Sequence, residues 1–335
     1  MDIESDFYNY SFFTNDNDEF GPVYHSVKLI ASDLDGTIID KNNNISEDNF
    51  KAIEEIHNKN ICFVICTGKS FAVCKNICSQ FNASYGVFGN GTQIIDFKTG
   101  QEIYRNLLSK QDLLYAVTFA KRLNLHIHIY TDTEIISEHL MYMDLRNFFK
   151  KQDTRSDLKF KLVDNILDYI SHNNENVFSA IVSSETSLKE FENLLLTDKN
   201  IVSTNVNKRG NYKDCTINKE YEYIHISPKN VDKDIALNFI GDYLKIDKKN
   251  MVAVGDNVND LEMVKNSGFG VAVNDAYNEL KNVATYVTKK TVTEGAFAEA
   301  VYRVIWIVWK WTEKSGLPVG TVLVAGGRQR DVTVV

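Results

Sequence analysis

The sequence lacks the features of a membrane or exported protein. Its first 24 residues contain no lysine or arginine, whereas secretory and transit peptides need basic residues. The nearest approach to a long apolar run, Val301–Trp311, is short and contains Arg303 and Lys310. A helix that spans a bilayer needs roughly 20 apolar residues. We therefore expect a cytoplasmic protein that has no membrane partner.

Basic charge and metal-binding cysteine pairs are scarce as well. The 37 Lys and Arg residues are outnumbered by 45 Asp and Glu residues, and the formal net charge of −8 argues against a nucleic-acid partner. A small anionic substrate stays open, because local charge decides its binding. No two of the five cysteines have the C-x-x-C spacing that zinc prefers. Cys62, Cys66, Cys74 and Cys78 lie in strand and helix patterns, so we expect them to pack in the core.

What the sequence does contain is a regular alternation of apolar strands and amphipathic helices. A chain of 335 residues, 44% hydrophobic and 24% charged, is typical of a globular protein with about two domains. The apolar strand pattern at Ile61–Cys66 is followed by a helical pattern at Ser70–Phe81. The strand pattern at Asn250–Val254 is preceded by a helical pattern at Asp232–Tyr243. The predicted fold class is therefore α/β, with a Rossmann-like core built on a mostly parallel sheet.

A different pattern interrupts this alternation between residues 98 and 214. The stretch Leu125–Ser137 alternates on both sides of a turn, which predicts an antiparallel hairpin. A helix is expected near His139–Lys151. The parallel pattern resumes with a predicted strand at Glu220–Ser227. We therefore predict an α+β domain that is inserted into the core.

These patterns set the predicted boundaries. The predicted segments are an N-terminal extension (1–24), the core (25–97 and 215–311), the inserted domain (98–214) and a C-terminal tail (312–335). The tail differs in composition from the rest of the chain, because residues 315–335 hold four of the 17 glycines and no asparagine. We interpret it as a non-native or disordered appendage; the alternative is a divergent C-terminus.

Carboxylates gather where apolar strands of the predicted core end. The polar residues directly after three such strands are Asp33 and Asp35, Thr67 and Gly68, and Asp256 and Asp260. Each group alone is compatible with an ordinary solvated turn. In an open parallel sheet, however, ligands bind outside the carboxyl ends of the strands. We therefore expect the three loops to meet at one crevice.

Several carboxylates in one crevice repel one another and call for a cation. A set of oxygen ligands favours Mg²⁺, which keeps several waters and takes few protein carboxylates. A magnesium site beside a free carboxylate suits phosphoryl transfer, and aspartate is a known nucleophile in that chemistry. Mg²⁺ is therefore the expected cofactor.

Together the three motifs resemble those of the haloacid dehalogenase (HAD) superfamily of phosphatases. They read Asp33-Leu34-Asp35-Gly36-Thr37, then Thr67-Gly68, then Gly255-Asp256 with Asn259-Asp260. The large insert after the second motif resembles the Cof-type branch, in which an α/β cap occupies that place. The resemblance covers the chain from Val27 to Val304, and it implies a HAD core with a cap domain.

The resemblance implies roles for the motif acids. Asp33 would attack the phosphorus and become phosphorylated. Asp35 would protonate the leaving oxygen and then activate water, as a general acid and base does. The metal would be held by Asp33, the backbone carbonyl of Asp35 and Asp256, with support from Asn259 and Asp260.

It also implies a phosphate-binding set. Thr67, through its hydroxyl, and Gly68, through its N–H, would hold phosphate oxygens. The family also has a lysine motif between Thr67-Gly68 and Gly255-Asp256. Lys233 is favoured over Lys229 for it, because a lysine at a helix N-terminus opposes the helix dipole unless an anion lies nearby. Either lysine is also compatible with a solvated surface position. Asn90 resembles the point at which Cof-type chains run toward the cap, so it is a candidate substrate or hinge residue; the alternative is a plain turn.

The function implied by the resemblance is a Mg²⁺-dependent phosphatase of small phosphorylated metabolites, with sugar phosphates as the favoured class and an aspartyl-phosphate intermediate. A phosphomutase of the same fold would pass the phosphoryl group to a sugar instead of water. The other alternative is a catalytically inactive HAD-fold regulatory or binding protein. In such a protein the motif acids would be expected to be replaced by other residues. The expected partner is the small phosphorylated metabolite, and the chain is expected to act as a monomer or homodimer.

Overall fold

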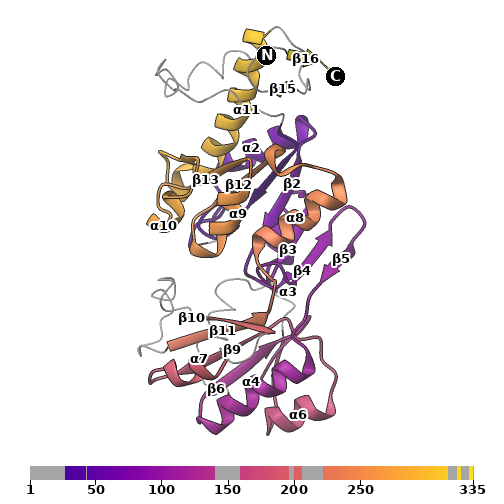
Figure 1. Ribbon diagram of the computed structural model, residues 1–335, viewed down its shortest axis with the longest axis vertical. Helices are drawn as coiled ribbons and strands as arrows, with labels where there is room; N and C mark the ends of the chain where they lie inside the picture. Colours follow the sequence, from indigo (N-terminus) through magenta and orange to yellow (C-terminus); the bar gives the residue numbers. More distant parts are fainter. Residues whose placement is uncertain are drawn as a thin grey trace. The chain divides into compact units, whose positions relative to one another are not determined.

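The computed structural model describes residues 27–42, 44–139, 159–195, 200–205, 222–315, 323–325 and 332–334 (Figure 1). The chain divides into two compact units, of which residues 27–306 form the larger one and the two terminal segments form the other. The predictions for residues 1–24 and for a helix near His139–Lys151 lie outside the described residues. Among the helices that are described, none has the length and apolar character needed to cross a bilayer.

The larger unit contains an eight-stranded sheet with the order β14-β13-β12-β1-β2-β3-β4-β5, which lies in the first of its two hydrophobic cores. Neighbouring strands from β14 to β3 run parallel, and β4 and β5 add an antiparallel edge. The strands are β1 (Leu29–Ser32), β2 (Cys62–Cys66), β3 (Tyr85–Phe88), β4 (Gln93–Asp96), β5 (Gln101–Arg105), β12 (Met251–Gly255), β13 (Phe269–Ala272) and β14 (Tyr286–Val287). All four residues of β1 are buried, which is expected of a parallel strand covered on both faces. The predicted α/β class with a parallel-sheet core is confirmed.

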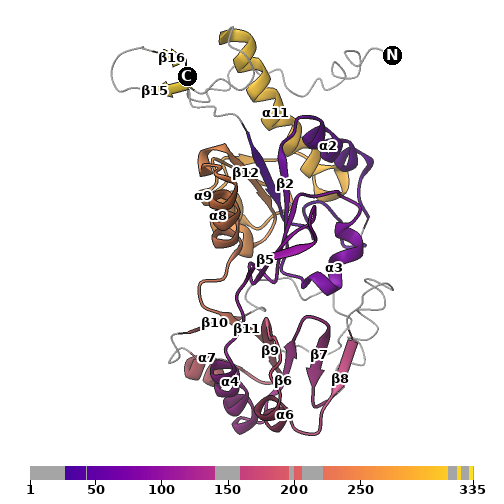
Figure 2. The ribbon, with the colours of Figure 1, turned by 90° about the vertical axis from the view of Figure 1, so that its right-hand side faces the viewer.

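Helices cover both faces of this sheet. Figure 2 shows α8 and α9 on one face and α2 and α11 on the other. The helices are α2 (Glu47–Asn58), α3 (Phe71–Cys78), α8 (Lys233–Leu244), α9 (Leu261–Asn266), α10 (Asn278–Lys281) and α11 (Ala296–Ser315), with 3₁₀ turns η2 (Lys248–Asn250), η3 (Val258–Asp260) and η4 (Val292–Glu294). Side-chain caps fix where the helices begin: the Ser46 hydroxyl accepts from Asn49 N–H at 3.2 Å, and the Asp232 carboxylate accepts from Ile235 N–H at 2.6 Å.

The described cysteines pack in this core, as predicted. Cys66, Cys74 and Cys78 are buried among its apolar side chains, and Cys62 packs against them. Within the described ranges, the side chains placed close enough to share a metal ion include no cysteine. The cysteines therefore contribute to packing.

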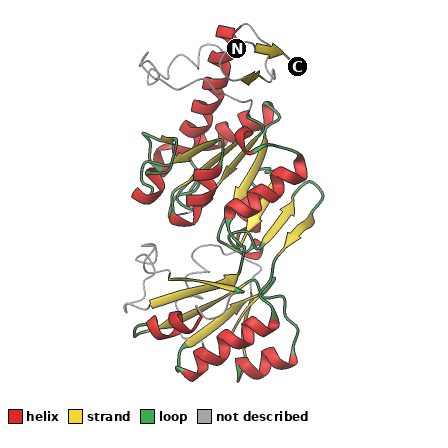
Figure 3. Ribbon diagram, viewed as in Figure 1, coloured by secondary structure: helices red, strands yellow, loops and turns green. Residues whose placement is uncertain are grey.

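A second sheet has six strands in the order β10-β11-β9-β6-β7-β8. The strands are β6 (His126–Tyr130), β7 (Glu134–Ser137), β8 (Lys159–Leu162), β9 (Ser179–Ser184), β10 (Ile201–Asn205) and β11 (Glu222–Pro228). The helices α4 (Lys110–Arg122), α6 (Ile166–His172) and α7 (Lys189–Leu195) pack on one face of it and share a hydrophobic core with it (Figure 3). β6 and β7 form the antiparallel hairpin that the sequence predicts.

The position of β11 corrects a prediction. We expected a strand at Glu220–Ser227 to resume the parallel core, but β11 pairs antiparallel with β9 and with β10 in the second sheet. Its side chains alternate: Ile224 and Ile226 are fully buried in the second hydrophobic core, while His225 between them is only partly buried. That alternation is typical of an antiparallel sheet with one covered face, whereas a core strand such as β1 is buried throughout.

The chain passes between the two sheets after β5 and again after β11. The β4–β5 hairpin stays in the first sheet, so the passages follow Arg105 and Pro228 instead of the predicted boundaries at 97/98 and 214/215. The Asn106 N–H donates to the Thr92 carbonyl at 2.8 Å, and its side-chain amide donates to the Lys229 carbonyl at 3.3 Å. The two passages are therefore hydrogen-bonded to each other.

The structure describes residues 312–315, 323–325 and 332–334 of the C-terminal tail. α11 continues to Ser315, and β15 (Leu323–Ala325) pairs antiparallel with β16 (Val332–Val334). The interpretation of the tail as a non-native or disordered appendage stays a prediction.

Candidate active site

The predicted convergence of loops occurs around β1. β1 pairs in parallel with β2 on one side and with β12 on the other, so the three strands end at the same edge of the sheet. Asp33 follows β1, Thr67 follows β2 and Asp256 follows β12. Polar side chains that lie far apart in the sequence are therefore brought to one crevice edge, the usual place for a ligand in a doubly wound sheet.

Lys233 lies at the middle of this arrangement. It is the first residue of α8, it is completely buried, and its Nζ donates to Asp33 Oδ1 and, at 2.6 Å, to Asp260 Oδ1. A buried ammonium needs such partners, because burial without them would be costly. Lys229, the other lysine candidate, has an exposed side chain. The structure thus brings Lys233 to the predicted site and leaves Lys229 at the surface.

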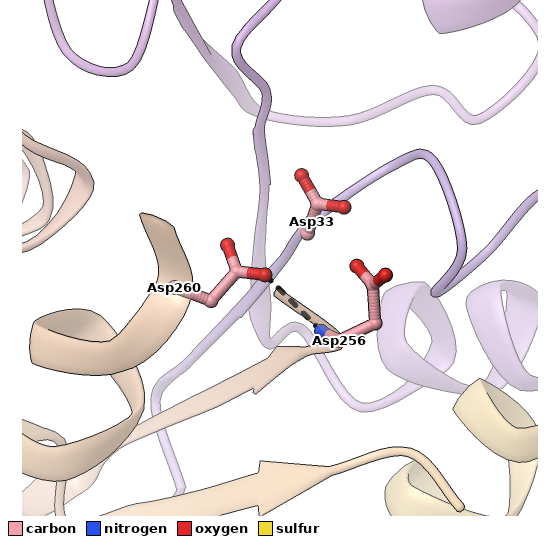
Figure 4. Close-up of side chains that lie close together, drawn as sticks. All are labelled: Asp33, Asp256 and Asp260. Carbon is pink, nitrogen blue, oxygen red and sulfur yellow. Dashed lines mark hydrogen bonds between the residues drawn. The ribbon is translucent and has the colours of Figure 1, made fainter. Parts of the chain in front are cut away.

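Three aspartates surround the lysine, and we call Asp33, Asp256, Asp260 and Lys233 together the acidic centre. Carboxylate oxygens of the three aspartates lie within 4.8 Å of one another, and Figure 4 shows the side chains gathered at the strand ends. Asp260 Oδ2 also accepts from the backbone N–H of Asp256, at 3.1 Å, and of Asn257, at 3.0 Å. Both oxygens of Asp260 therefore have protein donors, which makes Asp260 the residue that fixes the loop.

Burial and mutual repulsion set the charge of the centre. Burial raises the pKa of the Asp33 carboxyl to about 7; Lys233 opposes this rise, and the charges of Asp260 and Asp35 add to it. Burial likewise raises the pKa of Asp256, helped by Asp33 and Asp260. Burial disfavours the charged form of Lys233, but the carboxylates of Asp260 and Asp33 outweigh it and raise the pKa of the ammonium. Three acids thus face one fixed cation.

Gly36 explains why the first motif needs a glycine. Its φ of +82° is in the left-handed region, which favours glycine. A Cβ built on Gly36 would come within 2.5 Å of Asp256 Oδ2, so a side chain there would displace the Asp256 carboxylate. Thr37, the next residue, donates from its hydroxyl to Asp256 Oδ1 at 3.3 Å. The turn after β1 is therefore fitted closely against the loop after β12.

Asp35 lies beside the acidic centre and has a partner that the sequence analysis missed. Lys69 Nζ lies 2.6 Å from Asp35 Oδ1, and the Asp35 side chain is 45% exposed. The charge of Asp35 raises the pKa of the Lys69 ammonium in spite of partial burial. Lys69 directly follows Thr67 and Gly68 at the end of β2, and the rule that strand-end residues converge could have identified it.

Thr67, Asn90 and Asn259 also meet in the structure. Thr67 is buried, and its carbonyl accepts from the Asn90 N–H at 3.0 Å. The Asn90 side-chain oxygen accepts from Asn259 Nδ2 at 2.9 Å. The chain goes on from Asn90 into β4 and β5 of the same sheet, and it passes to the second sheet only after Arg105. Asn90 therefore contacts Thr67 and Asn259 and lies well before the passage to the second sheet, and its role as a substrate or hinge residue stays a prediction.

The fold and the acidic centre define a doubly wound α/β protein with its site at the carboxyl edge of the sheet. The haloacid dehalogenase-like hydrolase family matches residues 30–301, and the chain belongs to this family. Membership confirms the resemblance drawn from the sequence motifs.

Similar proteins agree with this assignment. A 5-amino-6-(5-phospho-D-ribitylamino)uracil phosphatase of Bacillus subtilis is 25% identical over 271 residues, which are 80% of this chain and 92% of that protein. The crystal structure of a haloacid dehalogenase-like hydrolase from Bacteroides thetaiotaomicron has 23% identity and a TM-score of 0.69, and the match covers 83% of this chain and all of that one. A sugar phosphatase of HAD subclass IIB has 16% identity and a TM-score of 0.66, over 84% and 100% of the two chains.

Proposed function

We propose that this protein is a Mg²⁺-dependent phosphatase that acts in the cytoplasm on small phosphorylated metabolites, with sugar phosphates as the favoured class. Its general class rests on the family: a haloacid dehalogenase-like hydrolase with a curated phosphatase among its relatives is a phosphoric monoester hydrolase. The observation that carries the finer proposal is the buried acidic centre, in which three carboxylates face Lys233.

The side chains of the centre fit a hard divalent cation. Their oxygens lie close together, and the negative charge of three carboxylates exceeds the positive charge of the single lysine. Burial raises the pKa of both Asp33 and Asp256, and a bound cation would lower these pKa values again. Asp33, Asp256 and the main-chain carbonyl of Asp35 would hold the ion, with Asp260 and Asn259 in support. Bound Mg²⁺ would offset the negative charge of the phosphoryl oxygens.

Each residue of the site has its own role in the two steps of the reaction. A carboxylate oxygen of Asp33 attacks the phosphorus, the bond from phosphorus to the leaving oxygen breaks, and Asp35, in its protonated form, gives a proton to that oxygen. Asp35 next takes a proton from water, the water oxygen bonds to phosphorus, and the bond from phosphorus to Asp33 breaks, which frees phosphate and restores Asp33. Thr67 and Gly68 hold phosphate oxygens, and Lys233 keeps the Asp33 carboxylate in place.

The second sheet and its helices would form the cap. We assign the inserted domain of residues 98–214 this role, with both limits shifted toward the C-terminus by sheet membership, to the segment between Arg105 and Pro228. A cap of this kind closes over substrate and excludes water until hydrolysis. The relatives named above act on a phosphorylated ribityl compound and on sugar phosphates, and both classes are phosphate monoesters of polyhydroxylated carbon chains. We propose the same class for this protein.

The test is a hydrolysis assay on an aryl phosphate and a panel of sugar and sugar-alcohol phosphates, with Mg²⁺ and with EDTA. Wild type should turn over at least one substrate only with Mg²⁺. Asp33→Asn should lose activity by at least about 1000-fold, because it removes the nucleophile. Asp40→Asn, which changes a partly buried loop acid that accepts from Asn42 and Asn44, is the matched control and should keep full activity.

Acid quenching with a ³²P-labelled substrate should trap a phosphoenzyme in wild type and none in Asp33→Asn. Full activity of Asp33→Asn, or turnover that ignores Mg²⁺, would overturn the proposed mechanism. Transfer of the label to an added sugar phosphate instead of water would identify the phosphomutase alternative. Absence of turnover on every substrate would favour an inactive binding protein.

A further inference from the structure

Asn90 holds together loops that come from different parts of the chain. Its φ of +58° is left-handed, a conformation that asparagine adopts more readily than most residues. Its N–H donates to the Thr67 carbonyl and its Oδ1 accepts from Asn259 Nδ2. The turn is also seated against the residue before Lys233, because a Cβ on Gly91 would come within 2.4 Å of the Asp232 carbonyl oxygen.

The contact with Asn90 determines which way the Asn259 amide faces. An amide carries its NH₂ and its oxygen on opposite sides, and here the NH₂ is bonded to Asn90 Oδ1. The Asn259 Oδ1 therefore points away from Asn90. This oxygen is buried from solvent, and within the described ranges it has no hydrogen-bond partner. Buried acceptors without a partner are rare in native proteins, so the oxygen is free for a ligand.

The place of Asn259 in the chain indicates which ligand. Asn259 lies in η3, between Asp256 and Asp260 of the acidic centre. Asp260 uses both of its oxygens on protein donors, to Lys233 and to two backbone N–H groups. The unused acceptor of Asn259 is thus added to a loop whose carboxylates already fit a hard cation that keeps its waters.

We propose that Asn90 is a positioning residue for the metal centre. By accepting from Asn259 Nδ2 it turns Asn259 Oδ1 into the site, where this oxygen would accept from a water of the bound cation. The inference rests on the proposed Mg²⁺ dependence. It gives Asn90 a function that acts through Asn259, without contact to substrate or metal.

The test compares Asn90→Gly with Asn90→Asp in the full-length protein. Both residues tolerate the left-handed backbone, but only aspartate keeps an oxygen that can accept from Asn259. Isothermal titration with MgCl₂ should show about 10-fold weaker binding for Asn90→Gly, as expected when an outer-sphere partner is removed. Asn90→Asp should bind Mg²⁺ at least as tightly as wild type.

A double substitution shows whether Asn90 acts through Asn259. Asn259→Ala alone should weaken Mg²⁺ binding, and adding Asn90→Gly to it should cause no further loss. If Asn90→Gly lowers the melting temperature in EDTA but leaves Mg²⁺ affinity unchanged, Asn90 is only structural and the inference is overturned. If wild type itself binds no Mg²⁺, the proposed function fails as well, so the two failures are distinguishable.

Discussion

Among single residues, Lys233 has the largest expected effect on stability. Its ammonium is completely buried between Asp33 and Asp260. Lys233→Met leaves both carboxylates without their cation. We expect the free energy of unfolding in EDTA at pH 8 to fall by about 3–5 kcal/mol, the usual cost of breaking a buried ion pair from one side. Urea denaturation followed by circular dichroism measures it.

Lys229→Met is the matched control, because Lys229 is exposed and begins the same stretch before α8. Its effect should stay within about 0.5 kcal/mol, as for most surface substitutions. Equal effects of the two substitutions would contradict the central position of Lys233. Added Mg²⁺ should restore part of the free energy of unfolding that Lys233→Met loses, because the positively charged ion also offsets the charge of the carboxylates.

The raised pKa of Asp33 predicts how metal binding depends on pH. With a pKa of about 7, Asp33 is largely protonated at pH 6 and ionised at pH 8, so protons compete with Mg²⁺ below neutrality. The affinity for Mg²⁺ should rise from pH 6 to pH 8 and level off above it. Titration in buffers of different ionisation enthalpy should show proton release at pH 6, and a pH-independent affinity would refute the prediction.

The same shift sets the stability of the metal-free protein. The pKa of Asp33 in the folded protein is above the ordinary value of 3.8 for an aspartate, so the folded protein binds more protons than the unfolded chain between these two values. Without metal, stability should therefore increase as pH falls from 8 toward 6. Asp33→Asn should flatten this slope, because asparagine does not titrate.

The motif residues of the site could be predicted from the sequence, and the contacts that two further residues make with them could not. Asp33 and Asp256 follow apolar strands directly, and Lys233 follows a helix-capping residue, so local pattern places all three. Lys69 and Asn90 have contacts that depend on how separate loops meet, Lys69 with Asp35 and Asn90 with Asn259. Those contacts arise from tertiary packing, which no local pattern reports.

At the scale of structural elements, the turn after β1 carries the clearest test. Gly36→Ala adds a methyl group at a left-handed φ of +82°, where it would meet Asp256. Gly100→Ala adds one at φ +71° with no atom within 4 Å. Both should lose about 1 kcal/mol of stability from backbone strain. Only Gly36→Ala should also weaken Mg²⁺ binding, which titration calorimetry measures; equal binding by both variants would exclude the close fit.

The elements themselves were predictable to different degrees. β1 and β12 are continuous apolar runs bounded by polar turns, which is a strong local signal. β11 also has a clear strand pattern, but the sequence-based prediction places this strand in the wrong sheet. Its pairing with β9 and β10 depends on residues that it meets only in the folded protein. β5 similarly stays in the first sheet through its pairing with β4.

At the scale of the whole molecule, the two sheets have separate hydrophobic cores that share no residue among those the structure describes. Asn106 and Lys229 are hydrogen-bonded where the chain leaves and re-enters the first sheet, so a short linker can join them. We expect a variant in which residues 107–228 are replaced by a Gly-Ser linker to unfold cooperatively and to bind Mg²⁺ as wild type does. Circular dichroism and calorimetry check this, and loss of folding would show that the first core depends on the second.

This variant should keep some hydrolysis of a small aryl phosphate and lose discrimination among sugar phosphates, since the proposed cap would be missing. The measurement is the ratio of kcat/KM values across the substrate panel. An unchanged ratio would show that the second sheet does not select the substrate.

The central place of β1 between β2 and β12 also affects how the protein is made. β1 is synthesised early, but one of its two neighbours, β12, follows roughly 200 residues later, a delay of about 10–40 s at ordinary translation rates. During that time an apolar strand on the nascent chain has one unpaired edge, which is a template for aggregation. A polypeptide that stops before β12 would contain Asp33, Asp35 and Thr67 but no complete site. We expect such truncated chains to be inactive and to depend on chaperones for solubility.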